Sequence, residues 1–143
     1  MTTFVVDASV GAKWASPEIV EPLADCADRF LREYVDGSVQ VLVPDLFWIE
    51  IGSFLWKAAK RGEITAILAQ RGLEAMLNRD FPTVPSRTVL PEAFKLAADF
   101  GRTVYDSIYV ALAVATGNEL ITADERLVNA LGTRFPIRWL GVF

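Results

Sequence analysis

Short runs of apolar residues, rich in valine and isoleucine, alternate along this chain with longer segments that have helical periodicity. The runs that we predict to be strands are Thr3–Val6, Val39–Val43, Pro82–Val84, Glu119–Thr122 and Ile137–Leu140. The predicted helices are Pro22–Val35, Leu46–Lys60, Ile64–Asn78, Pro91–Phe100, Tyr105–Thr116 and Glu125–Leu131. Strands that alternate with helices of this length form an α/β domain, in which a mostly parallel sheet is covered on both faces.

Prolines, glycines and one aspartate mark several of the predicted helix ends. Pro22 is placed at a first helical position, where its missing N–H is not needed, and Asp45 is placed to cap the helix that follows it. Gly37, Gly101 and Gly117 stand where C-terminal caps are expected. These signals support the helix boundaries independently of the hydrophobic pattern.

Length and composition predict one domain over residues 1–143, in the cytoplasm. A chain of 143 residues with 52% hydrophobic residues can bury a substantial core, and it has no linker or repeat. The longest apolar run, Ile108–Ala115, is too short to cross a membrane, and the start has no basic region typical of a signal peptide. The single cysteine, Cys26, cannot form an internal disulfide, which suits a reducing compartment.

The absence of histidine limits the chemistry that this chain can perform. It excludes Ser-His-Asp and Cys-His triads as well as zinc sites with histidine ligands. The net charge of −4 argues against a basic protein that coats nucleic acid. If four of the 18 acids formed one metal site, however, the remaining 14 would balance the 14 Lys and Arg residues. Any catalysis must therefore come from carboxylates, hydroxyls, Lys or Arg, or a metal held by oxygen.

Four acids lie in apolar surroundings where a carboxylate is not expected. Asp7 directly follows the run Phe4-Val5-Val6, and Asp124 closely follows the predicted strand at Glu119–Thr122. Glu50 and Asp106 lie in helices that are otherwise almost wholly apolar. In open α/β sheets, ligands bind beyond the carboxyl ends of the strands, where Asp7 and Asp124 are expected.

Each of these acids also has a purely structural interpretation. Asp7 could cap the turn after its strand, Glu50 could reach solvent at a helix edge, and Asp124 could be an N-cap. Asp106 could belong to a capping box with Thr103. Capping and catalysis are compatible for one carboxylate, so these interpretations do not exclude a shared site.

Carboxylates that converge at one sheet edge need a partner. Buried, unpaired acids are unfavourable and would repel one another, and hard divalent cations with oxygen ligands relieve that repulsion. An all-carboxylate site therefore indicates metal-assisted attack of water on a phosphodiester, which requires no histidine.

Four segments that contain these acids resemble one known family. "VVDASV" with the following "KW" and "PE" is similar to the N-terminal motif of PIN-domain ribonucleases, in particular VapC-type toxins of bacterial and archaeal toxin–antitoxin pairs. The segments "VPDLFWIEIGSFLWKA", "TVYDSIYVALAVATGNELITAD" and "TADERL" agree with that family in order and spacing. Together they span Phe4 to Leu140.

The resemblance implies a fold, an activity and partners. The implied fold is a three-layer α/β/α arrangement with a five-stranded parallel sheet. The implied activity is Mg²⁺- or Mn²⁺-dependent endonucleolytic cleavage of RNA, with tRNA and rRNA among the targets. Members of the family are usually homodimers, silenced by a cognate antitoxin whose C-terminal segment lies over the active site. The family's acidic and hydroxyl positions fall on Asp7, Glu50, Asp106, Asp124, Ser9 and Thr122.

The acids are expected to hold the metal. We expect Asp7 and Asp106 to be direct ligands and Asp124 to bind directly or through water, while Glu50 either binds metal or orients the attacking water. Ser9 and Thr122 are expected to hydrogen-bond a carboxylate or a metal-bound water. Alternatively, Ser9 could be a hydroxyl at the start of a helix, and Thr122 could be an ordinary strand residue.

RNA requires positive charge for its phosphates, and two residues near the acids could supply it. Arg102 lies four residues before Asp106, and Lys13 lies near Asp7. Basic residues at helix ends are also commonly solvated partners of the helix dipole.

Two other functions remain open within the same family. The chain could be a PIN nuclease that acts in RNA processing outside a toxin–antitoxin pair, or a catalytically silent PIN domain that only binds. The silent form is expected to lack one or more acids, whereas this chain has all four. Aspartate-nucleophile phosphatases are disfavoured because they need a second acid where this chain has Ser9.

Overall fold

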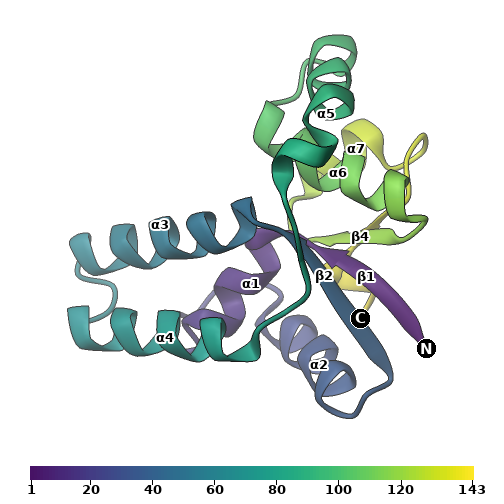
Figure 1. Ribbon diagram of the computed structural model, residues 1–143. Helices are drawn as coiled ribbons and strands as arrows, with labels where there is room; N and C mark the ends of the chain where they lie inside the picture. The colour runs from purple at the N-terminus through teal and green to yellow at the C-terminus, as the bar shows by residue number, and fades with distance from the viewer.

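The computed structural model describes residues 1–143 as a five-stranded sheet with helices around it (Figure 1). The strands are β1 (Thr2–Val6), β2 (Val39–Pro44), β3 (Thr83–Val84), β4 (Glu119–Thr122) and β5 (Ile137–Trp139). The helices are α1 (Ala8–Ala15), α2 (Ala24–Val35), α3 (Leu46–Lys60), α4 (Ala66–Arg79), α5 (Ser86–Phe100), α6 (Val104–Thr116), α7 (Glu125–Leu131) and the 3₁₀ turn η1 (Leu140–Val142). The predicted α/β fold with a parallel five-stranded sheet is confirmed.

The strand order is β3-β2-β1-β4-β5, and every pair is parallel. The chain leaves the central strand β1 towards β2 and β3 and then returns to the other side for β4 and β5. The order therefore reverses between β1 and β4, where Val6 pairs with Ile121. Such a reversal opens a crevice at the carboxyl ends of the two strands, the usual ligand site of an open α/β sheet.

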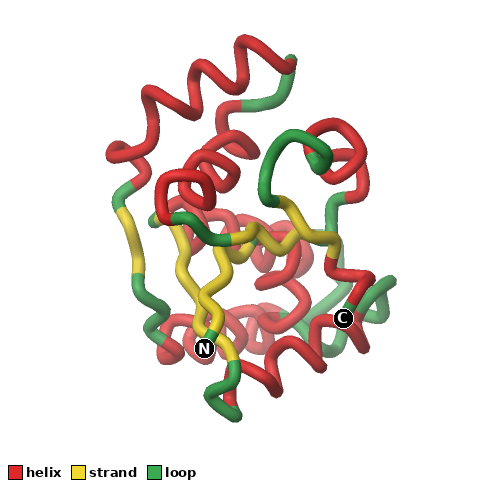
Figure 2. Tube along the Cα trace, turned by 90° about the vertical axis from the view of Figure 1, so that its right-hand side faces the viewer, coloured by secondary structure: helices red, strands yellow, loops and turns green.

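Helices cover both faces of the sheet. Right-handed crossovers place the helices that follow β1 and β2 on one face and those that follow β3 and β4 on the other. Accordingly α2 packs on β2, while α6 packs on β1, β2 and β4. Figure 2 shows helices on both sides of the strands. In Figure 1, α3 and α4 extend away from the sheet as one arm, and α5, α6 and α7 lie in another direction.

The core is continuous from the sheet into α6. Phe4, Val5 and Val6 of β1 are buried, and so is every residue of α6 from Ser107 to Ala113. Burial on both sides explains why these segments read as uninterrupted apolar runs rather than as alternating patterns. The same burial makes the carboxylates at their ends unusual.

Helix α1 is not among the predicted helices. Its eight residues include Val10 and Gly11, which have low helix propensity, so its stability depends on packing. A Cβ atom on Gly11 would lie 2.6 Å from the Phe47 ring, so a glycine is needed where α1 approaches α3. The helix is thus specified by a contact between distant segments, which the local pattern does not reveal.

Three predicted helix starts are wrong by two residues or more. Helix α4 begins at Ala66 and not at Ile64, because Thr65 caps it by accepting the N–H of Leu68 (3.1 Å). Helix α2 begins at Ala24 and not at Pro22, because Leu23 takes a left-handed conformation with φ of 67°. Helix α5 begins at Ser86 and includes Pro91 in its interior. The Ser86 N–H donates to Oδ1 of Asp45 (2.9 Å), so the first turn of α5 is anchored from a distant loop.

Asp45 lies at the predicted N-cap position of α3, but its side chain makes no capping hydrogen bond there. It binds the backbone and hydroxyl of Ser86 instead, and these hydrogen bonds lower the pKa of Asp45. Gly101 and Gly117 end α5 and α6 with φ of 66° and 69°, as predicted. No helix is long and apolar enough to cross a membrane.

Candidate functional site

The four predicted acids come from four elements around the carboxyl ends of β1 and β4. Asp7 directly follows β1, and its N–H donates to the carbonyl of Ile121 in β4 (3.0 Å). Asp124 occupies the N-cap position of α7, Glu50 lies near the start of α3, and Asp106 lies in the first turn of α6. In Figure 1 the starts of α1 and α3 meet the strand ends at this junction.

Asp7 is the most buried of the four, and two hydroxyls hold one of its oxygens. Oδ2 accepts hydrogen bonds from Ser9 Oγ (2.7 Å) and Thr122 Oγ1 (2.8 Å). Ser9 Oγ accepts the N–H of Ala123 (3.0 Å), and Thr122 Oγ1 accepts the N–H of Asp124 (3.1 Å). Each hydroxyl hydrogen is thereby directed to Asp7, whose Oδ1 has no hydrogen-bond donor within the protein.

Glu50 is held by a residue that the sequence analysis did not single out. Tyr109 is almost fully buried, and its hydroxyl donates to Glu50 Oε1 (2.6 Å). Burial, and then the charges of Asp7 and Glu50, raise the pKa of Tyr109 far above its usual value, so the phenol stays protonated. The available signal was its position three residues after Asp106, which places both side chains on one helix face.

Asp106 faces Arg102, the predicted RNA contact, which lies four residues before it in the chain. The Arg102 Nη2 atom lies 3.5 Å from Asp106 Oδ2, and both side chains are partly buried. The Asp106 N–H donates to Thr103 Oγ1 (3.0 Å), so Thr103 caps α6. The expected capping interaction is therefore present at the backbone, while the carboxylate pairs with Arg102.

Asp124 caps a helix with one of its carboxylate oxygens. Its Oδ1 accepts the N–H of Arg126 (3.0 Å) and the N–H of Leu127 (3.4 Å), which caps α7. No protein donor binds its Oδ2. Capping thus fixes the orientation of the carboxylate without using both of its oxygens.

One arrangement is common to all four acids. Each has one oxygen in a hydrogen bond or ion pair with a protein donor and a second oxygen without one. Burial raises the pKa of Asp7, Glu50 and Asp106, and the charges of neighbouring acids raise it further. The hydroxyl donors of Asp7 and Glu50 and the Arg102 charge beside Asp106 act in the opposite direction.

The chemistry of these donors fits a hard divalent cation. They are oxygen atoms of acids that repel one another, which is the ligand type that Mg²⁺ and Mn²⁺ prefer. No three acidic side chains are arranged to hold one ion between them. Mg²⁺ is commonly bound through one or two carboxylates and keeps several waters, so a site for it does not require three converging acids.

A cavity of about 400 Å³ opens beside Glu50 and Asp124, while Asp7 and Asp106 do not line it. It is lined by Ser9, Glu50 and Asp124, and also by Lys13 and Glu21. Lys13 Nζ lies 3.4 Å from Glu21 Oε1. The predicted cation Lys13 therefore lies at this site, together with Glu21, an acid that the sequence did not indicate. Arg102 does not line the cavity.

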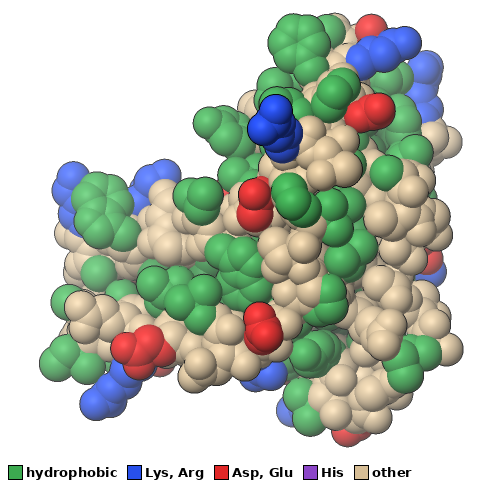
Figure 3. Space-filling model, in the orientation of Figure 1, with side chains coloured by type: hydrophobic (Ala, Val, Ile, Leu, Met, Phe, Trp, Pro, Cys, Tyr) green, Lys and Arg blue, Asp and Glu red, His purple; other side chains and the backbone are tan.

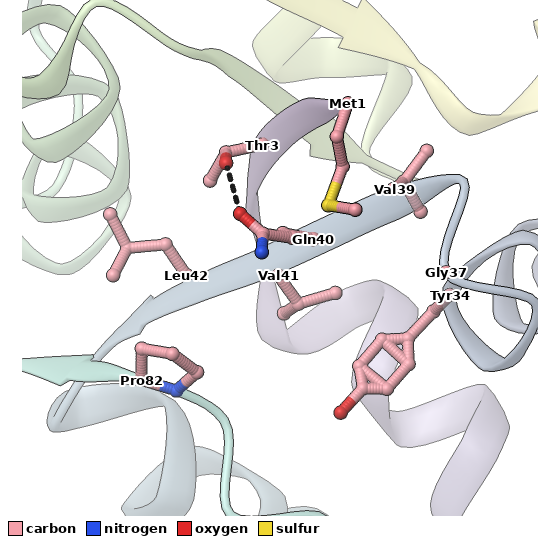
Figure 4. Close-up of a pocket in the computed structure, with 9 residues that line it drawn as sticks. All are labelled: Met1, Thr3, Tyr34, Gly37, Val39, Gln40, Val41, Leu42 and Pro82. Atoms are coloured by element: carbon pink, nitrogen blue, oxygen red, sulfur yellow. Dashed lines mark hydrogen bonds between the residues drawn. The ribbon is translucent and has the colours of Figure 1, made fainter.

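A second cavity, of about 470 Å³, lies at the edge of the sheet beside β2 (Figure 4). Its lining includes Met1, Tyr34, Val41 and Pro82, and the polar side chains of Thr3 and Gln40 hydrogen-bond each other (3.2 Å). No charged side chain lines it. It therefore offers no chemistry comparable to the acidic cavity.

The fold and the acids define an α/β protein whose candidate site is a group of carboxylates at the point where the strand order of a parallel sheet reverses. Comparison with known families is specific: the model of the PIN domain matches residues 4–131, and the chain belongs to this family.

Individual relatives agree with this assignment. The protein named Ribonuclease VapC3 of Pyrobaculum aerophilum is 35% identical over 134 residues, which cover 92% of this chain and 94% of that protein. The crystal structure of PAE2754 from the same organism matches with a TM-score of 0.72 at 22% identity, over 99% of this chain and 91% of that one. VapBC2 of Rickettsia felis, solved with a DNA fragment from its promoter, matches with a TM-score of 0.64 at 12% identity, over 96% and 98%.

Proposed function

We propose that this chain is an endoribonuclease that depends on Mg²⁺ or Mn²⁺ and acts as the toxin of a toxin–antitoxin pair. The observation that carries the proposal is the division of oxygens at Asp7, Glu50, Asp106 and Asp124, where one oxygen is fixed and the other is free. In a PIN domain whose relative is named a ribonuclease, such a site suits hydrolysis of RNA phosphodiester bonds.

Asp7 and Asp106 would hold the metal directly through their free oxygens. Asp124 would bind it directly or through water, and Glu50 would either bind the metal or orient the attacking water. When bound, the metal lowers the pKa of a water molecule and stabilises charge on the leaving oxygen. The protein's own contribution is to fix the direction of each ligand, since Ser9 and Thr122 restrain Asp7, and Tyr109 restrains Glu50. Such outer contacts commonly change metal affinity or activity about 10- to 100-fold.

The RNA strand requires cations beside the acids, and Arg102 and Lys13 are the two that we propose. Arg102 pairs with Asp106, and Lys13 lines the acidic cavity. Phosphate contacts of this type position the strand without reading its bases. The choice among tRNA, rRNA and other RNAs therefore depends on surfaces outside these residues.

The toxin role implies a protein partner and a cytoplasmic location. A solved structure similar in fold to this chain is described as a toxin–antitoxin complex from Klebsiella pneumoniae. We therefore propose a cognate antitoxin that covers the acidic site, together with a homodimer of this chain. An RNA-processing nuclease of the same family would cleave RNA without such an antitoxin.

Cleavage of RNA labelled at both ends tests the proposal. We expect discrete internal cuts in a tRNA and rRNA pool with Mg²⁺ or Mn²⁺, none with EDTA, and none from Asp7→Asn or Asp106→Asn proteins. Asp99→Asn is the matched control, because Asp99 is exposed and lies outside the site.

The pattern of failure separates the alternatives. Cuts that survive EDTA or either site substitution would contradict the metal–carboxylate mechanism. Shortening from one labelled end would indicate an exonuclease. Metal-dependent melting without any cleavage would favour a silent binding domain.

A further inference from the structure

Lys13 is an unusual lysine because its side chain is only 11% exposed. It lies one helical turn after Ser9 on the same face of α1, so it points to the side of the helix where Ser9 binds Asp7. A nearly buried ammonium requires a nearby negative charge. Glu21, from the segment between α1 and α2, supplies one at 3.4 Å.

The contact between these two residues is an ion pair without a hydrogen bond. Glu21 Oε1 is buried and has no hydrogen-bond partner, although the Lys13 ammonium is within ion-pair distance. Both side chains line the cavity that Glu50 and Asp124 also line. Lys13 is the only cation in that lining.

The surrounding acids explain why such a lysine needs a partner of its own. Glu50 and Asp124 line the same cavity, and a lysine on its flexible stem would be drawn to their carboxylates. Lys13 would then compete with a metal ion and withdraw its charge from any phosphate in the cavity. Glu21 is the acid that Lys13 contacts instead.

We propose that Glu21 is a positioning residue, which holds Lys13 at the wall of the acidic cavity so that its ammonium contacts a phosphate of the bound RNA strand. This inference rests on the proposed nuclease function. It assigns no chemical step to Glu21, which acts only through Lys13.

Positioning of Lys13 by Glu21 and simple charge repulsion predict opposite changes in RNA affinity when Glu21 is neutralised. Removing an acid beside a phosphate site would by itself reduce repulsion and tighten RNA binding. If Glu21 positions Lys13, Glu21→Gln must instead weaken binding, because the lysine is released towards the remaining acids.

Fluorescence anisotropy with a labelled, mixed-sequence single-stranded RNA 12-mer tests this in Mg²⁺ over a series of KCl concentrations. All variants carry Asp106→Asn so that the probe stays intact. We expect Glu21→Gln to weaken binding about threefold to tenfold, the size of one modest polar contact. Lys13→Met should lower the slope of log affinity against log salt by about 0.7, the value for one phosphate contact on a single strand.

Three further proteins make the result specific. Lys13→Arg should restore the slope, and Glu21→Gln combined with Lys13→Met should bind no more weakly than Lys13→Met alone. Glu119→Gln is the matched control, since Glu119 pairs with Arg138 (2.6 Å) on β4 and β5, away from the cavity. Melting temperatures of all variants distinguish a loss of binding from a loss of folding.

Unchanged or tighter binding by Glu21→Gln would overturn the inference, and so would an unchanged salt slope for Lys13→Met. Those results would leave the nuclease proposal intact if the unaltered chain cleaves RNA. Absence of RNA binding by the Asp106→Asn parent, together with absence of cleavage by the unaltered chain, would overturn both.

Discussion

Among the single residues, Asp7 is the one on which the site depends most. It joins the end of β1 to the start of α1, and its side chain is bound by hydroxyls from α1 and β4. Its carboxylate is buried beside other acids, so the folded protein resists its ionisation. In the proposed nuclease, Asp7 would therefore contribute to function at a cost to stability, which is typical of catalytic groups.

This electrostatic conflict predicts how stability depends on pH. Because the pKa values of Asp7, Glu50 and Asp106 are raised in the folded state, the folded protein retains protons that the unfolded chain has released. In EDTA the free energy of unfolding should therefore fall as pH rises from about 5 to 7, above the unfolded carboxyl pKa of about 4. Thermal melts across this range measure the effect.

Asp7→Asn should flatten that pH dependence and raise the melting temperature at pH 7. Mg²⁺ should raise the melting temperature of the unaltered protein, because a cation replaces protons among the acids. Stability that increases between pH 5 and 7 in EDTA would contradict the proposed electrostatics.

Tyr109 gives a second prediction about one residue. Tyr109→Phe removes the hydroxyl that fixes Glu50 Oε1 and leaves the ring in the core. We expect cleavage to fall about 10- to 100-fold, as for other contacts that orient metal ligands. Steady-state cleavage of a labelled RNA measures it.

Tyr105→Phe is the control for this change, because Tyr105 lies in the same helix, is 61% exposed and makes no side-chain hydrogen bond. Equal activity of the Tyr109→Phe and unaltered proteins would show that Glu50 does not need this contact.

Among the helices, α1 shows how a close approach between elements shapes the site. It carries Ser9 and Lys13, and it packs against α3, which carries Glu50. Gly11 allows this approach because any Cβ there would meet the Phe47 ring. Gly11 has no chemical role, but by allowing this approach it helps to set the distance between Asp7 and Glu50.

Gly11→Ala should therefore destabilise the protein by about 1–3 kcal/mol through overpacking. The matched control is Gly52→Ala in α3, where a Cβ would meet no atom within 4 Å. That control should be stabilising by up to about 1 kcal/mol, because alanine favours a helix interior over glycine. Denaturant unfolding of both variants measures the difference, and equal stabilities would contradict the packing argument.

The same elements show what a sequence alone can reveal. The strands were predictable because buried parallel strands read as apolar runs, and the acids were visible because they interrupt apolar segments. Helix α1 and the start of α5 were not predictable, since each depends on a distant partner, Phe47 and Asp45 respectively. The roles of Tyr109 and Glu21 were not predictable for the same reason, since they depend on packing between segments.

For the molecule as a whole, two exposed apolar surfaces lie away from the core. On α3, Ile49 and Trp56 are 70% and 60% exposed, and Lys60 lies over the Trp56 ring. On α5, Leu90 and Phe94 lie one turn apart and are also exposed. Figure 3 shows apolar side chains gathered over both arms, and such patches commonly mark protein interfaces.

Charge distinguishes these two surfaces as candidates for the proposed contact between two copies of the chain. The α3 surface ends in Lys57, Lys60 and Arg61, so two copies of it would repel each other. The α5 surface carries Glu92 and Lys95, of both signs, which suits a symmetric contact between two copies.

Sedimentation should therefore show the chain at twice its mass of 15.8 kDa. Phe94→Ser should dissociate this dimer, while Trp56→Ser, the control on the other arm, should not. Retention of the dimer by Phe94→Ser, or its loss in Trp56→Ser, would contradict this assignment of surfaces.

Anomalous diffraction from crystals grown with Mn²⁺ tests most directly whether these acids hold a metal. We expect a manganese peak beside the free oxygens of Asp7 and Asp106, with Asp7 Oδ1 among its ligands, and loss of the peak in Asp7→Asn crystals. A Mn²⁺-saturated crystal with no peak at these acids, or with the peak retained in Asp7→Asn, would contradict the proposed metal site.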